Sequence, residues 1–224
     1  MPASAHYDNM DLVNSPLEQG VLVSRSINIS SVDIDSVFHM MESPRTIWSS
    51  PNQPFSISFG SAITLSASGD SRFEQIMNNA TLSLSNTDID TIGSKIFPLK
   101  FFGGFSFDAR HKESPPWSGF PSALFVLPRV QLIQSKDGFE LILNEYGDDI
   151  DPIQVELNLL SLKSKLESTP VSSYPVLPSQ LIKLTPSVSR NLWTSQLTDV
   201  LSIIENKSLD KIVLAQSLKA TLKH

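Results

Sequence analysis

One lysine close to the C-terminal end of the sequence is the residue whose position most directly suggests chemistry. Lys211 opens the apolar run Lys211–Leu218, which we predict to be a strand. Side chains alternate between the two faces of a strand, so Lys211, Val213 and Ala215 share one face. A lysine buried in a cavity on such a face loses its proton more readily, and the free amine can then act as a general base. The alternative interpretation is a lysine at a strand edge whose ammonium reaches solvent.

A pair of glycines is the second candidate. Gly103 and Gly104 lie inside the predicted strand Phe101–Asp108. Phosphate-binding loops need glycines between a strand and a helix, in the patterns GxGxxG or GxxxxGK[ST], and neither pattern occurs in the sequence. We therefore favour a structural role, in which a missing Cβ lets a backbone or bulky side chain approach the sheet. Ligand binding is the alternative.

An aromatic loop and an acidic stretch are the remaining candidates. Trp117, with Phe120-Pro121, could line a pocket, but an aromatic residue beside prolines more commonly anchors a loop on the core. The acidic stretch could attract Mg²⁺, but it lacks EF-hand spacing and most of it is expected on a turn, so a solvated loop is favoured. Its members are Glu140, Glu145, Asp148, Asp149 and Asp151.

Composition excludes several classes of protein. The 224 residues contain no cysteine, which excludes disulfide scaffolds, cysteine-ligated zinc and thiol nucleophiles. The formal net charge of −6 argues against nucleic acid or an anionic membrane as a partner. No apolar run approaches the roughly 18 residues that a membrane-spanning helix needs. The N-terminal residues do not resemble a secretory signal or a transit peptide, so we expect a cytoplasmic protein. The four histidines are far apart in the sequence and do not suggest a metal site: His6, His39, His111 and His224.

The pattern of apolar and turn-forming residues predicts an α+β fold with a mostly antiparallel sheet and flanking helices. Asp137-Gly138 is a strong hairpin signal between two strands. Strands are predicted at 21–29, twice between 47 and 65, and at 101–108, 123–127, 130–134, 139–144 and 211–218. Helices are predicted at 34–41, 72–79, 153–166 and after the capping residue Ser189. The domain organisation predicted is a polar lead-in (1–18), an α+β region (19–167), a Pro/Ser-rich linker (168–186) and the start of a further region (187–224).

Several segments, in order along the chain, resemble the menaquinone-type isochorismate synthases of the chorismate-utilising enzyme family. Each segment is weak alone, but together they run in register from residue 45 to residue 216 and cover most of the chain. The segments are Arg45–Pro51 with Ser58–Ala62 (W-x-x-P … G-x-A), Phe102–Asp108 (GGFxFD), Trp117–Pro121 (WxxFP), Phe125–Pro128 (xxLP) and Leu209–Gln216 (KVVLAR).

The resemblance implies a role for Lys211 and a partial version of the fold found in anthranilate synthase component I. In that family the lysine of the KVVLAR strand is the general base that activates water for attack on C2 of chorismate. Relatives that use ammonia, the anthranilate synthases, typically carry glutamine at that position. Gln216 departs from the pattern, because arginine is usual there and the ammonia-using relatives often have glutamine. A fragment of a related anthranilate- or salicylate-type synthase therefore remains an alternative.

The resemblance also implies that this chain holds only the N-terminal half of such an enzyme. Family members are about twice as long, and the other half supplies the general-acid carboxylate, the Mg²⁺-binding glutamates and the residues that bind the substrate carboxylates. We therefore expect Mg²⁺ and chorismate to belong to the full-length enzyme, Lys211 to be the only catalytic position present, and the chain alone to be inactive. Two other hypotheses stay open: a split module that binds a partner carrying the missing half, and a non-catalytic domain that kept the fold.

Overall fold

A computed structural model of the chain describes residues 20–93, 98–110, 114–115, 117–136, 138–169 and 180–223. The chain forms two compact units, Met1–Ser173 and Tyr174–His224. The polar lead-in predicted for residues 1–18 lies outside the described residues, as do residues 170–179 of the predicted linker.

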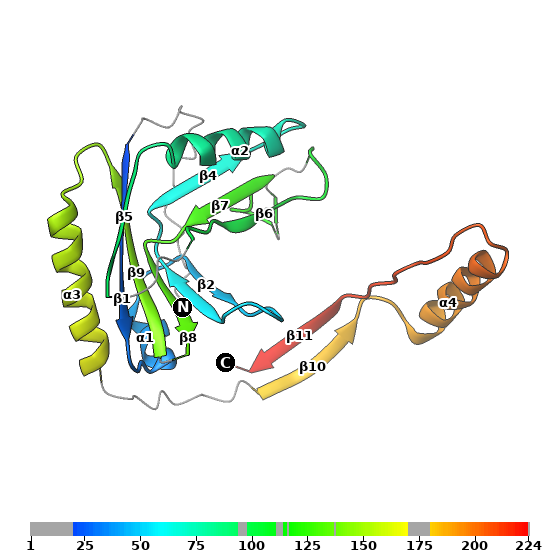
Figure 1. Ribbon diagram of the computed structural model, residues 1–224. Coiled ribbons are helices and arrows are strands. Elements are labelled where there is room, and N and C mark those ends of the chain that lie inside the picture. The colour runs from blue at the N-terminus through cyan, green and yellow to red at the C-terminus, as the bar shows by residue number, and fades with distance from the viewer. Residues whose placement is uncertain are drawn as a thin grey trace. The chain divides into compact units, whose positions relative to one another are not determined.

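Two β-sheets and the helices packed on them make up the described part of the first unit (Figure 1). The strands are β1 (Val21–Ile29), β2 (Arg45–Trp48), β3 (Ser56–Phe59), β4 (Ile63–Ala67), β5 (Thr87–Ile92), β6 (Phe102–Phe105), β7 (Ala123–Leu127), β8 (Val130–Ser135) and β9 (Gly138–Gly147). The helices are α1 (Ile34–Met40), α2 (Arg72–Ser83) and α3 (Pro152–Ser168).

The sheets are mostly antiparallel, as predicted. The six-stranded sheet has the order β2-β3-β8-β9-β1-β5, and β1 and β5 are its parallel pair. The three-stranded sheet has the order β4-β7-β6 and is antiparallel. The α+β fold class is therefore confirmed. Between residues 45 and 67 the chain forms three strands, where the sequence pattern predicted two.

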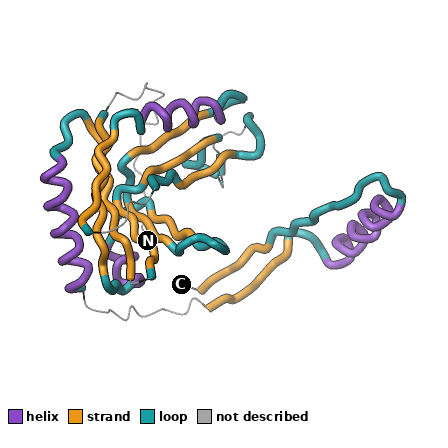
Figure 2. Tube along the Cα trace, in the orientation of Figure 1, coloured by secondary structure: helices purple, strands orange, loops and turns teal. Residues whose placement is uncertain are grey.

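The main core lies between one face of the six-stranded sheet and helices α1 and α3 (Figure 2). Ile57 and Phe59 of β3 point into this core, as the alternating pattern of that strand predicts. The serines between them are buried as well: Ser56 is 6% and Ser58 2% exposed. Strand β3 is therefore buried on both faces.

Aspartate side chains cap the starts of two helices. The carboxylate of Asp33 accepts a hydrogen bond from the backbone N–H of Ser36 at the start of α1, at 3.3 Å. Asp151 accepts from the backbone N–H of Ile153 at the start of α3, at 2.9 Å, a cap that the sequence analysis did not predict. Helix α2 extends four residues beyond the predicted end at Asn79, and its Ser83 is buried. Packing against β4 and β7 accompanies this extra turn, which sequence periodicity did not predict.

Strand β5 is held to the edge of the large sheet by a forked ion pair. Arg25 of β1 donates from Nη1 to Oδ1 of Asp88 at 3.1 Å and from Nη2 to Oδ2 at 2.8 Å. The Arg25 side chain is 8% and the Asp88 side chain 44% exposed. The hydrogen bonds from Arg25 hold the pKa of the Asp88 carboxyl below its ordinary value of 3.8, although partial burial opposes the shift.

We expect Asp88→Asn to destabilise the first unit at neutral pH, by roughly 1–2 kcal/mol, because buried Arg25 loses its charged partner. A carboxyl with a lowered folded-state pKa contributes stability above its unfolded-state pKa, and the contribution is lost as the pH falls through the folded-state value. The difference in unfolding free energy from wild type should therefore be full above about pH 5 and shrink below about pH 4. Urea unfolding over this pH range measures this difference.

Asp90→Asn on the same strand is the control. The Asp90 side chain accepts a hydrogen bond from the backbone N–H of Thr91, which the asparagine oxygen can also accept, so stability should change little. A difference that does not change with pH would contradict the assignment.

The second unit contains β10 (Gln180–Pro186), α4 (Arg190–Glu205) and β11 (Leu218–Lys223). Strands β10 and β11 are antiparallel neighbours, and β10 occupies the last seven residues of the interval predicted as linker. The prediction of a strand at Lys211–Leu218 is wrong. Strand β11 begins at Leu218, and residues 211–217 pair with no described strand. A strand needs a neighbour to complete its hydrogen bonds, and here the neighbour β10 meets the residues that follow.

Among the described residues, none of the helices combines the length and apolar character that crossing a membrane requires.

Candidate functional site

Lys211 lies at the start of an extended segment between α4 and β11, drawn as loop in Figure 2. Helix α4 begins at the predicted cap, where Ser189 accepts from the backbone N–H of Leu192 at 3.3 Å. It ends in a turn in which Lys207 has a φ of 56°, a conformation uncommon for residues other than glycine. This turn reverses the chain and leads it into the segment that carries Lys211.

Two hydrogen bonds hold the far end of the Lys211 segment. The backbone N–H of Ser187 donates to the carbonyl of Ser217 at 3.0 Å. The side-chain amide of Gln216 donates to the carbonyl of Val188, also at 3.0 Å. Gln216, the residue that departs from the family pattern, therefore ties this segment to the corner between β10 and α4.

Exposure alternates like that of a strand from Lys211 to Ala215, although no described strand pairs with these residues, and the alternation ends at Gln216, which is exposed. Lys211, Val213 and Ala215 are exposed, whereas Ile212 and Leu214 are half-buried. Lys211 thus shares a face with Val213 and Ala215, as predicted. Its exposed side chain is not in the apolar cavity that the base role requires, because no wall of described residues encloses it.

Apolar side chains of the second unit are largely uncovered. No residue of α4 is buried, although Leu192, Leu197 and Leu201 form part of its predicted apolar stripe. Leu192 is 53% and Leu201 57% exposed, and Val213 on the extended segment is 78% exposed. An amphipathic helix is stabilised mainly by burying its apolar face. The second unit therefore presents an apolar surface on the elements that flank Lys211.

The acidic stretch is built into the structure rather than arranged around a metal. Glu140 and Glu145 belong to β9, and Glu140 is only 2% exposed, so the prediction of a solvated loop is wrong for these two. Arg129 donates from Nη2 to Oε1 of Glu145 at 2.7 Å, and its Nη1 lies 3.4 Å from Oε1 of Glu42. The hydrogen bonds to Glu145 raise the pKa of the Arg129 guanidinium above its ordinary value.

The described residues do not fit a Mg²⁺ site. They contain no group of three or more histidine, aspartate or glutamate side chains that could hold a metal ion. Of the stretch considered above, Asp151 caps α3 and Glu145 pairs with Arg129. We derive no metal-dependent step from them.

The two glycines of β6 differ in their surroundings. A Cβ added to Gly103 would lie 2.0 Å from the carbonyl oxygen of Leu124 and 2.6 Å from Cα of Phe125 on the neighbouring strand. Nothing lies within 4 Å of a Cβ added to Gly104. The structural interpretation is therefore supported for Gly103, which lets β7 approach closely.

Trp117 does not anchor its loop on the core, contrary to the prediction. Its side chain is 59% exposed, and that of Phe120, 6.1 Å away between ring centroids, is 58% exposed. The sequence pattern identified aromatic residues in this loop but could not show which way their rings point.

A cavity in the first unit was not anticipated from the sequence. It has a volume of about 270 Å³ and lies beside the Arg129–Glu42 pair, between the end of α1, α3 and the large sheet. It contains none of the residues singled out from the sequence. Its lining residues are Met40, Met41, Glu42, Arg129, Val130, Leu143, Asn158 and Leu162.

Comparison with known proteins gives three findings. The family described as chorismate binding enzyme matches residues 9–224. Isochorismate synthase MenF of Bacillus subtilis (strain 168) is 27% identical over 123 residues, which are 54% of this chain and 25% of that protein. The solved structure of MenF, the menaquinone-specific isochorismate synthase from Escherichia coli, matches with a TM-score of 0.58 and 14% identity, over 91% of this chain and 42% of that one.

The chain thus spans less than half the length of the relatives that it matches. The structural match covers 91% of this chain. The family match covers nearly the whole sequence, including the Lys211 segment. This chain belongs to the family of chorismate binding enzymes.

Proposed function

We propose that this chain is the N-terminal portion of an isochorismate synthase and that Lys211 is its general base. The observation that carries the proposal is the position of Lys211 at the start of an extended, unpaired segment, Leu209–Gln216, that resembles the KVVLAR strand of the family. Family membership supports chorismate as the substrate. A lysine at this position favours water over ammonia as the nucleophile.

The proposed reaction exchanges one hydroxyl group for another on the chorismate ring. The Lys211 amine takes a proton from a water molecule, and the water oxygen forms a bond to C2. The ring double bonds shift and the C4 hydroxyl leaves, protonated by a general acid. The product is an isomer of the substrate, so no oxidant or reductant is required. Mg²⁺, expected in the full-length enzyme, would hold a substrate carboxylate.

The uncovered apolar surface of the second unit supports a site completed by further polypeptide. Val213 and the apolar side chains of α4 would be buried by such polypeptide, and an unpaired extended segment can accept a strand. Burial of this surface would also supply the low-dielectric surroundings that a neutral lysine needs. We use the term complementing portion for the part of the Escherichia coli MenF chain that has no counterpart in this chain.

Binding of a partner protein is the second candidate function, and the exposed apolar side chains of α4 favour it as well. In this hypothesis the chain works by binding a separate polypeptide that carries the complementing portion. A non-catalytic domain is the third hypothesis, and an exposed Lys211 is compatible with it. In each case we place the protein in the cytoplasm, and for the enzyme on the route to menaquinone or a related product.

Mixing experiments separate these hypotheses. We expect the purified chain, assayed with chorismate and Mg²⁺, to form no isochorismate and to bind no Mg²⁺ tightly, because one base without an acid or a metal site cannot complete the reaction. Addition of the complementing portion should restore turnover. Isochorismate formation by the chain alone would contradict the proposal, and a bound but inactive mixture would favour the non-catalytic domain.

A further inference from the structure

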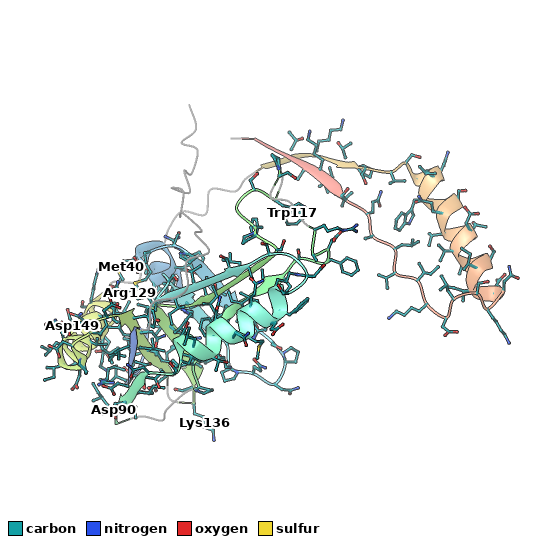
Figure 3. The ribbon with its side chains drawn as sticks, turned by 90° about the horizontal axis from the view of Figure 1, so that it is seen from above. Met40, Asp90, Trp117, Arg129, Lys136 and Asp149 are labelled. Atoms are coloured by element: carbon teal, nitrogen blue, oxygen red, sulfur yellow. The ribbon has the colours of Figure 1, made fainter. Side chains whose placement is uncertain are left out.

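Exposed aromatic rings lie on and beside the three-stranded sheet of the first unit. They form two contacting pairs, Phe73 with Phe105 and Trp117 with Phe120, and Phe107 is exposed as well. Figure 3 shows Trp117 on the side of this unit away from Met40, Arg129 and Asp149. We use the term aromatic surface for Phe73, Phe105, Phe107, Trp117 and Phe120, whose exposed fractions are 51%, 37%, 107%, 59% and 58%. Phe105 also packs against Phe125 of β7, with ring centroids 4.9 Å apart, whereas the other four side chains are more than half exposed.

Part of the aromatic surface is held in place by a buried arginine. Arg72, only 6% exposed, places its guanidinium carbon 4.5 Å from the ring centroid of Phe73. Its Nη2 donates to the carbonyl of Ser106 at 3.2 Å, which fixes the backbone between Phe105 and Phe107. The rings of Phe73 and Phe105 have centroids 4.2 Å apart. These contacts fix the α2 and β6 side of the surface before any partner binds.

Hydrogen bonds fix the described residues on either side of the other two rings. The backbone N–H of Ser106 donates to the carbonyl of Ser122 at 2.8 Å, which closes the loop at its base. The N–H of Phe120 donates to the carbonyl of Trp117 at 3.1 Å, which brings these two rings edge to face. A partner that binds such ordered rings loses little conformational entropy.

The size and composition of the aromatic surface fit a protein partner. Aromatic side chains bury about 150–250 Å² each, so these five can contribute on the order of 600 Å², close to the roughly 800 Å² per partner of a standard interface. Tryptophan and other large aromatic residues are also common among the side chains that dominate binding energy.

The complementing portion is the polypeptide that best fits the aromatic surface. More than half of the Escherichia coli MenF chain has no counterpart here, because the match covers 42% of it. That large portion must pack against some surface of the part that does match. Four of the five rings belong to Phe102–Asp108 and Trp117–Pro121, two segments that resemble family motifs, yet in this chain they contact solvent.

We infer that the aromatic surface is the docking site on the first unit for the complementing portion. This inference rests on the proposed function, but it concerns elements separate from the Lys211 segment. The rings of the aromatic surface become buried in the complex. Trp117 and Phe120 are the main anchors, because both are more than half exposed and their rings pack edge to face.

Calorimetric titration of the complementing portion into the chain tests the inference. The double variant Trp117→Ala/Phe120→Ala should bind roughly thirtyfold more weakly than wild type or worse. Ile153→Ala is the matched control: Ile153 is 70% exposed on α3, so a similar apolar loss there should leave affinity unchanged. Thermal unfolding of all variants should match wild type, since the truncated rings do not cover the core.

The outcomes separate this inference from the proposed function. Lys211→Ala should lose turnover of the mixture while its affinity changes far less than that of the double variant. If the double variant binds as tightly as wild type, the aromatic surface is not the docking site and the proposed function stands. If wild type does not bind the complementing portion, both are overturned. Self-association of the chain that the double variant abolishes, measured by sedimentation, would assign the surface to a second copy instead and overturn the inference.

Discussion

Lys211→Ala should reduce isochorismate formation by the chain mixed with the complementing portion about 10²–10⁴-fold, the usual contribution of a general base. Without the amine, the attacking water must lose its proton to solvent. Affinity for the complementing portion should change far less than the rate, because the uncovered apolar side chains of α4 and Val213, rather than the Lys211 amine, supply most of the surface to be buried there. Initial rates with chorismate and Mg²⁺ measure the effect.

Two further lysine variants sharpen this test. Lys211→Arg keeps the positive charge, but a guanidinium does not give up its proton in proteins, so this variant should be as inactive as Lys211→Ala. If the residue only supplied a positive charge to bind a substrate carboxylate, arginine would restore much of the activity. Lys219→Ala removes an exposed lysine from β11 in the same unit and should leave the rate unchanged. Turnover retained by Lys211→Ala would disprove the base assignment.

Gly103→Ala should destabilise the protein more than the addition of a methyl group anywhere else on β6. The new Cβ would lie 2.0 Å from the carbonyl oxygen of Leu124 and 2.6 Å from Cα of Phe125, and neither backbone atom can rotate away. Strands β6 and β7 would have to separate, so we expect a loss of roughly 2–3 kcal/mol or more in unfolding free energy. Urea denaturation followed by circular dichroism measures this loss.

Gly104→Ala provides a control one residue away. Nothing lies within 4 Å of its added Cβ, and replacing a strand glycine usually reduces the entropy lost on folding. The Gly104→Ala protein should therefore be as stable as wild type or slightly more stable. Equal effects of the two substitutions would show that the close approach of β7 does not explain the paired glycines.

Local patterns were enough to predict most elements of the first unit. Strand β1 has the predicted bounds Val21–Ile29, and the Gly138 hairpin joins β8 to β9 as expected. Helix α3 begins at Pro152, one position before the predicted start, and Asp151 caps it. These features depend on periodicity, caps and turn residues that lie within a few positions of one another.

Pairing between distant segments could not be predicted in this way. Strand β5, which is parallel to β1, was not identified. Its residues alternate only weakly, and its place is set by pairing with a strand about 60 residues earlier and by the ion pair between Arg25 and Asp88. The outward direction of Trp117 likewise depends on how the whole loop closes at Ser106 and Ser122. Burial is a property of the assembled sheets, not of a short window of sequence.

The amino-acid sequence by itself determined the order of most elements, the resemblance to chorismate-utilising enzymes and the position of Lys211 at the start of an apolar run. Only the tertiary structure decided that Leu218–Lys223, rather than Lys211–Leu218, pairs with β10, and that Lys211 and α4 are left uncovered. The physical reason is that an apolar, alternating segment can form a strand anywhere along its length. Which residues become the strand depends on where a neighbour supplies hydrogen-bond partners, and that neighbour is distant in the sequence.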